Sequence, residues 1–408
     1  MNAARRIMII GGGPAGVAAA LGAKQQDSGA EVVLLNDEPH EPYEKPPLSK
    51  AVLMGKAAPL DTPIAGPKGV AGSGVTLKGG TRIAAIDRAA HTVTSAAGEC
   101  LTYDVLVLAT GSFNRVLPGF LPGQPGLFYL RTEAEARALA ARLRESQSLI
   151  VIGGGLIGLE VAASAAEIGV RAITVFEVAP RVLARVCDAE TSSFIEQYHR
   201  ARGVDLRLGT ALRGRAAGER PAVETMAGEI VAADLIVVGI GAVPDDALAK
   251  SAGLATNDGI LVDARCRSLD PDVFAAGDCT RFPGPHGPIR LENWRHAQEH
   301  GAIAGRNAAG GDVSYAVAPS FWSEQFDLYI QGVGWPVANT SARVHRPMSG
   351  NTRLLFELDG SHIAYAMGIN AQRDIAMARR LIERRVPVDP EALADPGKPL
   401  AAMLKGRQ

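Results

Sequence analysis

The stretch Ile7–Gly22, IMIIGGGPAGVAAALG, joins a short apolar run directly to a cluster of glycines and then to an alanine-rich segment. Its glycines at positions 11, 13 and 16 follow the spacing GxGxxG. In this spacing the first glycine makes a tight turn, the second lets the backbone approach a pyrophosphate, and the third packs the helix on the strand. The N-terminus of the helix supplies an anion site. The stretch therefore predicts a strand, a phosphate-binding turn and a helix.

The flanking residues agree with this interpretation. Arg6–Ile10 is predicted to be a buried strand, Val17–Lys24 a helix, and EVVLLND from Glu31 the next strand, with Asp37 just past its end. A carboxylate at that place suits the hydroxyls of a ribose. A single glycine-rich turn is also compatible with a plain connection between a strand and a helix, so this match alone leaves both alternatives open.

The same plan occurs a second time. LIVIGGGLIGLEVAASAAEIGVRAITVFE from Leu149 places Gly153, Gly155 and Gly158 as the first turn places its three glycines, and its second strand ends in Glu177. Two such copies, each followed by an acid after the second strand, indicate an internal duplication. The sequence therefore predicts two dinucleotide sites.

Composition narrows the class of protein. The chain has 408 residues, 47% of them hydrophobic and 21% charged, which is typical of a globular protein of two or three domains. Its 42 basic and 43 acidic residues give a formal charge of −1, so we expect no nucleic-acid partner and no anionic membrane surface. No apolar run reaches the ~18 residues of a membrane span, and no signal-peptide profile opens the chain, so we expect a soluble cytoplasmic protein.

The four cysteines, Cys100, Cys187, Cys266 and Cys279, show no CxxC spacing. We therefore expect buried thiols rather than a zinc site or a redox dithiol, and no metal site at all.

Further short strands end in small residues. LTYDVLVLATGS from Leu101 predicts a strand running into Ala109, Thr110 and Gly111, and AADLIVVGIGAVPDD from Ala232 closes the second copy in the same way. LDPDVFAAGDCTRFPG from Leu269 predicts another strand, and a helical segment follows from Asn293. From about Pro319 the sequence pattern changes. Apolar and polar residues first alternate, as in an antiparallel meander, and then follow helical periodicity. This change predicts a third, C-terminal domain.

The order of these pieces resembles the flavin-dependent pyridine nucleotide-disulfide oxidoreductases. Six motifs resemble their ferredoxin and rubredoxin reductase branch: EPYEKPPLSK, ATG, LRT, GDCT, LENWRHAQEHG and FWSEQFD. The resemblance implies an α/β fold with two Rossmann-like dinucleotide-binding domains, arranged as in glutathione reductase, and a C-terminal α+β domain. We expect residues 1–111 and 241–318 to form the FAD-binding domain, 112–240 the NAD-binding domain, and 319–408 the C-terminal domain.

The resemblance also implies site residues. Lys50 and Glu160 are the candidates for tuning the flavin edge. The family usually has arginine at the position of Lys45. The lysine keeps the positive charge, but it lacks the guanidinium that can bind a phosphate through two hydrogen bonds. FAD contacts are expected at Gly11, Gly13, Pro14, Ala15, Gly16, Asp37, Lys45, Lys50, Ile83, Ala109, Thr110, Gly111, Arg131, Gly277, Asp278, Trp294 and Trp322. Glu160 is expected to face the flavin region. NADH contacts are expected at Gly153, Gly155, Leu156, Ile157, Gly158, Glu177, Arg185 and Gly241.

The implied function is electron transfer from NADH through FAD to a two-iron two-sulfur ferredoxin, or to rubredoxin. In the family this acceptor serves an aromatic-ring dioxygenase or a haem-thiolate monooxygenase. Disulfide and coenzyme A disulfide reductases are disfavoured, because no cysteine precedes Cys100. A flavoprotein of the apoptosis-inducing-factor type and a redox-sensing module without a ferredoxin acceptor stay as alternatives, and the protein is expected to be a monomer or a homodimer.

The nicotinamide donor is expected to be NADH rather than NADPH. Glu177 would accept from the 2′-hydroxyl of the ribose and repel a 2′-phosphate. Arg181 and Arg185 leave an alternative, since either side chain could accommodate a phosphate. Two interpretations of Arg185 stay open. Its side chain either packs over the loop that follows, or it contacts the adenosine end of NADH.

Overall fold

The computed structural model describes residues 4–285, 287–336 and 340–404. The chain divides into two compact units, each built from three segments. The first unit contains Met1–Lys45, Pro59–Phe113 and Ala242–Val317, and the second contains Pro46–Ala58, Asn114–Gly241 and Ala318–Gln408. The division into four domain segments drawn from the sequence stays a prediction.

A five-stranded parallel sheet forms the centre of the first unit, in the order β19-β7-β1-β2-β3. Parallel strands covered on both faces favour continuous apolar runs, and β1 and β7 consist almost entirely of buried aliphatic residues. The strand predicted at Arg6–Ile10 is present with those bounds. The five strands are β1 (Arg6–Ile10), β2 (Glu31–Leu35), β3 (Thr76–Lys78), β7 (Val105–Leu108) and β19 (Val273–Ala275).

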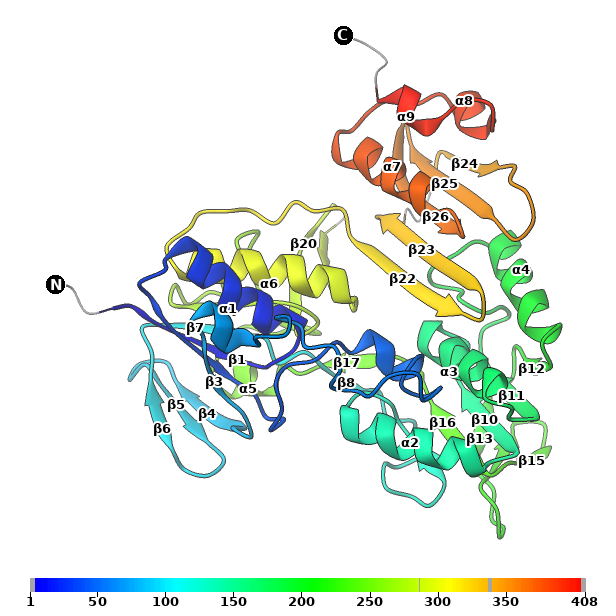
Figure 1. Ribbon diagram of the computed structural model, residues 1–408, viewed down its shortest axis with the longest axis horizontal. Helices are drawn as coiled ribbons and strands as arrows, with labels where there is room; N and C mark the ends of the chain where they lie inside the picture. The colour runs from blue at the N-terminus through cyan, green and yellow to red at the C-terminus, as the bar shows by residue number, and fades with distance from the viewer. Residues whose placement is uncertain (1–3, 286, 337–339, 405–408) are drawn as a thin grey trace. The chain divides into compact units, whose positions relative to one another are not determined.

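Two helices of this unit, α1 (Pro14–Gln26) and α6 (Trp294–Ala308), pack side by side (Figure 1). Helix α1 starts three residues before the predicted Val17, because a proline suits the first helical position and Ala15 and Gly16 continue from it. The two helices approach closely at glycines of α6. A Cβ on Gly301 would lie 2.1 Å from the carbonyl oxygen of Ala15, so only glycine fits there.

Smaller elements complete the first unit. A three-stranded antiparallel sheet, a two-stranded ribbon and a mixed three-stranded sheet lie outside the central sheet. They are β4 (Ile83–Asp87), β5 (Thr92–Ser95) and β6 (Cys100–Thr102); β8 (Ser112–Asn114) and β17 (Ala242–Pro244); and β18 (Ile260–Leu261), β20 (Thr280–Gly284) and β21 (Gly287–Ile289). Short helices are η2 (Val70–Ser73) and α5 (Ala247–Ser251).

The second unit repeats the central parallel sheet, in the order β12-β11-β10-β16-β9. Helix α2 begins with a capping box in which Thr132 and Glu135 satisfy each other's backbone N–H groups. The strands are β9 (Leu127–Phe128), β10 (Ser148–Ile152), β11 (Ala172–Phe176), β12 (Val204–Arg207) and β16 (Leu235–Val238), with a hairpin sheet of β13 (Leu212–Arg215), β14 (Ala222–Thr225) and β15 (Ile230–Ala232). The helices are η1 (Pro46–Ser49), α2 (Glu133–Glu145), α3 (Leu156–Glu167) and α4 (Ala189–Arg200).

The C-terminal part of the second unit is an antiparallel sheet in the order β22-β23-β26-β25-β24, with α7 packed on β26 and β23. The meander and the helix predicted beyond Pro319 are therefore present. The elements are β22 (Ser320–Gln325), β23 (Leu328–Gly334), β24 (Ala342–Arg346), β25 (Arg353–Asp359), β26 (His362–Ile369), α7 (Gln372–Glu383), α8 (Pro390–Ala394) and α9 (Leu400–Met403).

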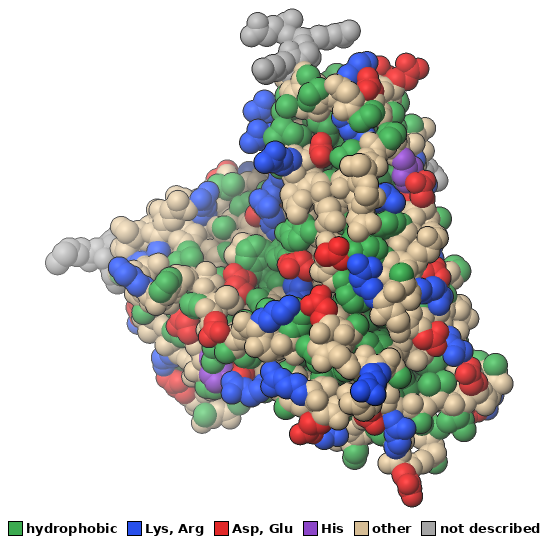
Figure 2. All heavy atoms as spheres, turned by 45° about the vertical axis from the view of Figure 1, so that its right-hand side comes forward, with side chains coloured by type: hydrophobic (Ala, Val, Ile, Leu, Met, Phe, Trp, Pro, Cys, Tyr) green, Lys and Arg blue, Asp and Glu red, His purple; other side chains and the backbone are tan. Residues whose placement is uncertain are grey.

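Acidic and basic side chains are interspersed on the face shown in Figure 2, as the balanced composition predicts. Among the described residues no helix is both long and apolar enough to cross a membrane. Of the four cysteines, Cys187, Cys266 and Cys279 are buried, but Cys100 is exposed. The expectation of a buried thiol is therefore wrong for Cys100, which lies at the start of the short strand β6 rather than in a central sheet.

Among the residues that the structure describes, three histidines are buried, and they make stability depend on pH. Burial lowers the pKa of His199 to about 4 and of His296 to about 3, and burial beside His296 holds the pKa of His300 well below its usual range. In the unfolded chain each of these histidines has a pKa of ~6.5. Below that pH the histidines of the unfolded chain bind protons, whereas the buried histidines of the folded chain stay neutral.

We expect the contribution of these histidines to the free energy of unfolding to be constant above pH ~7. It should fall as the pH drops from ~6.5 toward 4, by about 1.4 kcal/mol per pH unit for each histidine. Thermal unfolding followed between pH 7.5 and 5 tests this. The variant His296→Phe keeps a ring against Phe282, whose centroid lies 4.8 Å away, and should flatten the slope by one histidine's share. A melting temperature that does not change over this range would contradict the prediction.

Candidate functional site

The first glycine turn connects β1 to α1, and each of its three glycines has a different environment. Gly11 has φ +112°, and a Cβ there would lie 2.2 Å from the carbonyl oxygen of Ala109. A Cβ on Gly16 would lie 1.8 Å from the carbonyl oxygen of Gly11. A Cβ on Gly13 would meet no other part of the described chain within 4 Å. Gly11 and Gly16 are thus required by packing, whereas Gly13 borders open space.

The start of α1 is free of side-chain capping. Gly13 is the N-cap residue and Pro14 follows it, so no capping hydrogen bond reaches the first backbone N–H groups. Those groups and the helix dipole favour an anion at this end. The open space beside Gly13 is where a pyrophosphate would approach, so the turn fits the group predicted for it.

Several other predicted FAD residues lie near this turn. Ala109 contacts Gly11 as described above. Gly277 has φ +81° and lies against Ala15, because a Cβ added to Gly277 would be only 2.8 Å from the Cβ of Ala15. Asp278 accepts a hydrogen bond from the Ser112 hydroxyl at 2.9 Å. Gly277 is in turn fixed by His300, whose Nδ1 accepts from its backbone N–H at 3.3 Å. The first unit therefore brings the first turn and the GD pair together.

The remaining predicted residues of the first unit are more spread out. Asp37 is exposed beyond β2, Ile83 begins β4, and the Lys45 ammonium lies 3.1 Å from the Glu38 carboxylate. The Trp294 indole N–H donates to the Glu44 carboxylate, a partner that the sequence did not single out. Thr110 donates through its hydroxyl to the Asp245 carbonyl, and Gly111 accepts from the Asp245 backbone N–H at 2.9 Å.

The second glycine turn, between β10 and α3, reproduces the first. Gly153 has φ +113°, and a Cβ on it would lie 2.4 Å from the carbonyl oxygen of Gly239. A Cβ on Gly158 would lie 2.0 Å from the carbonyl oxygen of Gly153, whereas a Cβ on Gly155 would meet nothing else within 4 Å. Helix α3 also starts without a capping side chain. Leu156 and Ile157 open the helix, and Ile157 is exposed.

The acids that follow the two second strands occupy different positions. The strand registers pair Ile10 with Leu35 and Ile152 with Phe176. Glu177 is therefore the first residue after its strand and corresponds to Asn36, whereas Asp37 is one residue further on. The equivalence implied by the sequence repeat is off by one residue. Side-chain contacts agree, because a Cβ on Gly12 would meet the Asn36 side chain and one on Gly154 would meet Glu177.

The Glu177 carboxylate is held in place by the backbone. Its Oε2 accepts from the N–H of Gly154 at 2.6 Å and its Oε1 from the N–H of Ala179 at 2.8 Å. Arg181 uses its guanidinium to hold the loop after β11, donating to the carbonyl of Cys187 at 2.6 Å and of Ala184 at 2.9 Å. Arg185 is exposed and lies beside Gly241. A Cβ added to Gly241 would be 3.8 Å from Nη2 of Arg185.

Lys50 and Glu160 form an ion pair inside the second unit. Lys50 follows η1, Glu160 lies on α3, and the ammonium is 3.1 Å from Oε2 of the carboxylate. The side chain of Lys50 is 11% exposed and that of Glu160 only 2%. The Ser49 hydroxyl donates to the same Oε2, and the Ser323 hydroxyl donates to Oε1 at 2.6 Å. Lys50 and Glu160, which the sequence analysis gives as the candidates for tuning the flavin edge, are therefore paired with each other.

Two predicted FAD residues, Arg131 and Trp322, also lie in the second unit. Arg131 precedes helix α2, and Trp322 lies on β22 beside Gln331 of β23. The two serines that bind Glu160 were not singled out from the sequence, although both belong to motifs quoted for the resemblance. The motif FWSEQFD contains a signal for Ser323, because Ser323 and Gln325 are polar and occupy alternate positions, which lie on one face of a strand. In the structure both side chains are buried.

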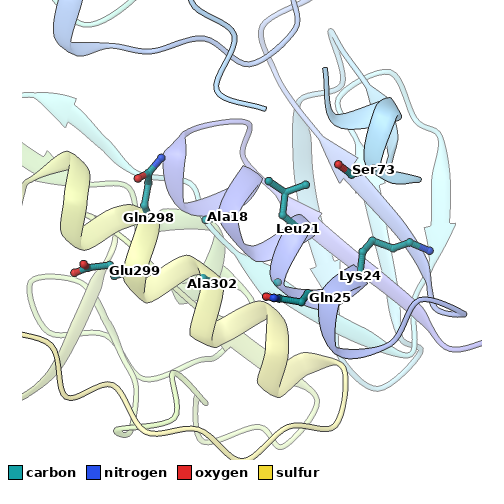
Figure 3. A pocket seen from close by; sticks show the side chains of 9 residues that line it. Ala18, Leu21, Lys24, Gln25, Ser73, Gln298, Glu299 and Ala302 are labelled. Carbon is teal, nitrogen blue, oxygen red and sulfur yellow. The ribbon is translucent and has the colours of Figure 1, made fainter. Parts of the chain in front are cut away.

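Two of the buried cysteines, Cys187 and Cys279, carry thiols that resist ionisation. Burial raises the pKa of Cys187 to about 12 and of Cys279 to about 11, which leaves both thiols protonated and inert. Within the described ranges no group of three metal-ligating side chains gathers. Figure 3 shows a surface pocket between α1 and α6, lined by residues such as Leu21, Lys24 and Gln298, and it contains none of the predicted cofactor residues.

Comparison with known proteins gives matches along nearly the whole chain. A family model described as pyridine nucleotide-disulphide oxidoreductase matches residues 5–301, and one described as reductase C-terminal matches residues 320–404. The chain is 37% identical to the anthranilate 1,2-dioxygenase system ferredoxin–NAD(+) reductase component of Burkholderia cepacia, over 95% of this chain and 97% of that protein. It is 35% identical to rhodocoxin reductase of Rhodococcus erythropolis, over 95% and 92% of the two chains. A crystal structure of the covalent putidaredoxin reductase–putidaredoxin complex contains a chain that superposes with a TM-score of 0.93 at 33% identity, covering 99% of both chains.

Proposed function

Because the chain belongs to the pyridine nucleotide-disulphide oxidoreductase family, we propose that it is an FAD-containing reductase that takes electrons from NADH and passes them to an iron–sulfur ferredoxin. The observation that carries this proposal is the pair of uncapped glycine turns, each with open space at its middle glycine. The names of the relatives support the acceptor, since one is a ferredoxin reductase component of a dioxygenase system. We further propose that the ferredoxin serves an oxygenase and that the reaction takes place in the cytoplasm.

We assign the first turn to FAD and the second to NADH. Around the first turn, Ala15, Gly277 and Asp278 would contact the flavin nucleotide, with Asp37 on its ribose. Around the second turn, Glu177, Arg185 and Gly241 would contact the NADH nucleotide. Both helix N-termini present backbone N–H groups to a pyrophosphate without competition from a capping side chain.

The chemistry that FAD supplies when bound is the acceptance of a hydride from NADH and the release of electrons one at a time. The protein contributes position and charge. Lys50 would place its ammonium to stabilise negative charge on the reduced ring, while Glu160 limits that charge by pairing with it at 3.1 Å. Hydride transfer requires close and aligned approach rather than a strong protein acid. The glycine turns and the helices that follow them would contribute by holding the two nucleotides in position.

A reduction assay tests the proposal. The purified protein should be yellow and contain one FAD, NADH should bleach it under anaerobic conditions, and a two-iron ferredoxin should restore the colour. Glutathione disulfide and coenzyme A disulfide should not restore it. Disulfide reductases carry their redox cysteines in the segment where this chain has EPYEKPPLSK, and that segment contains no cysteine. Protein that takes up no FAD, or that is bleached by NADH but reoxidised only by a disulfide, would overturn the proposal.

A cysteine-free variant sharpens this test. Replacing Cys100, Cys187, Cys266 and Cys279 with alanine removes every thiol, and we expect the rate of ferredoxin reduction to stay within about twofold of the starting protein, since core cysteines act here as small apolar residues. The thermal stability should fall, because three of the four side chains are buried. Loss of NADH-dependent bleaching in a folded variant would show that a thiol takes part.

A further inference from the structure

A line of buried polar side chains leads away from the Glu160 carboxylate inside the second unit. The Ser323 hydroxyl donates to Glu160 Oε1 at 2.6 Å, and the Gln325 amide nitrogen donates to Ser323 Oγ at 3.1 Å. His199 Nε2 lies 3.0 Å from Gln325 Oε1. Ser323, Gln325 and His199 are each 0% exposed. We call these three residues the donor line.

The direction of every hydrogen bond in the donor line follows from the carboxylate at its end. A carboxylate paired with an ammonium can only accept, so the Ser323 hydroxyl hydrogen points to Glu160. Ser323 Oγ must then accept from Gln325, which places the amide nitrogen at Ser323 and the amide oxygen at His199. An amide oxygen only accepts, so His199 carries a proton on Nε2. All three groups therefore donate toward Glu160.

The state of His199 is consistent with this direction. Its Nδ1 is buried and has no hydrogen-bond partner among the described residues, as expected for the unprotonated nitrogen of a neutral ring. Burial lowers the pKa of His199 to about 4, so the ring is neutral near pH 7. The Phe326 ring contacts it edge-on at 5.1 Å between centroids and fixes its orientation. The far end of the donor line is thus a fixed neutral donor.

The two oxygens of Glu160 have separate partners. Lys50 and Ser49 bind Oε2, and the donor line binds Oε1. Successive hydrogen bonds that point the same way polarise one another, most strongly where water is excluded. The donor line therefore draws negative charge toward Oε1 and leaves less of it to neutralise the Lys50 ammonium.

We propose that Ser323, Gln325 and His199 are positioning residues that set how far Glu160 neutralises Lys50 and, through Lys50, set the reduction potential of the bound flavin. This inference rests on the proposed function, because it takes Lys50 to act on the flavin ring. Without the donor line, more of the carboxylate charge faces Lys50. The reduced flavin, which is the electron-rich form, is then less stabilised.

The test is an equilibrium redox titration of the FAD-loaded protein, followed by the flavin absorbance. Ser323→Ala removes the donor to Oε1 and should shift the equilibrium about tenfold toward oxidised flavin, which is about 30 mV for a two-electron couple. Gln325→Met, which acts only through Ser323, should shift it in the same direction by less. Ser323→Thr restores a hydroxyl and should return the potential to that of the starting protein.

A matched control separates charge from packing. Ser192 is also a fully buried serine of the second unit, on α4 with His199, and donates to the Val182 carbonyl at 2.7 Å without touching the donor line. Ser192→Ala should lower thermal stability and leave the potential unchanged. An equal shift in this variant would overturn the inference.

An unchanged potential in Ser323→Ala and Gln325→Met, with FAD bound, would also overturn it. If Ser323→Ala does not fold, Gln325→Met alone decides. Failure of the proposed function is distinguishable, since the starting protein would then retain no FAD or would not be bleached by NADH, and the inference falls with it.

Discussion

Replacing Gly13 with valine is expected to give a folded protein that does not retain FAD. Gly13 has φ −76°, which any residue adopts, and a Cβ there meets no other part of the described chain within 4 Å. The fold therefore accepts the new side chain, and the loss falls on the ligand whose pyrophosphate needs that space. We expect the affinity for FAD to fall at least about 100-fold, or ~2.7 kcal/mol.

The measurements are the FAD content of the purified variant and its circular dichroism, which should match that of the starting protein stripped of flavin. Gly155→Val is the matched variant in the second turn, with the same open space and with φ −83°. It should stay yellow and be bleached by dithionite but not by NADH. Full FAD occupancy in folded Gly13→Val would show that the first turn serves the structure alone.

The sequence predicts the two glycine turns because their requirements are local. Gly11 and Gly16 are fixed by contacts with Ala109 and with the turn itself, and the same contacts recur at Gly153 and Gly158. Strand β1 follows from an uninterrupted apolar run, and the C-terminal meander follows from its alternation. Helix bounds are less accurate, since α1 begins at Pro14, before the alanine-rich periodicity is evident.

Features that depend on long-range packing could not be predicted in this way. The donor line joins α4 to β22, whose residues are far apart in the sequence, and only the fold brings His199 to Gln325. The off-by-one placement of Asp37 and Glu177 depends on strand register, which a repeat of glycines does not determine. Trp294 and Glu44 are likewise paired only by the fold.

The second large effect is expected at Glu177, where the choice between NADH and NADPH should be decided. Two backbone N–H groups hold the carboxylate, so its charge is fixed beside the second turn. Placing the 2′-phosphate of NADPH against a fixed like charge costs several kcal/mol. We expect kcat/KM to be higher with NADH, and Glu177→Gln, which keeps the size and removes the charge, to raise the NADPH-to-NADH ratio by about 30- to 100-fold, or ~2 to 3 kcal/mol.

Arg185 decides how the wrong cofactor would be accommodated once that charge is gone. Arg181 holds carbonyls of its own loop, so the exposed Arg185, beside Gly241, is the arginine placed to meet a 2′-phosphate. In the Glu177→Gln background, Arg185→Ala should therefore remove the part of the gain with NADPH that attraction to the guanidinium adds. In the starting protein it should only modestly weaken the binding of NADH. Steady-state kinetics of the four proteins with both nucleotides measure the coupling of the two residues. A starting protein that prefers NADPH would contradict the assignment of Glu177, and a gain that survives Arg185→Ala would show that relief of repulsion alone admits the phosphate.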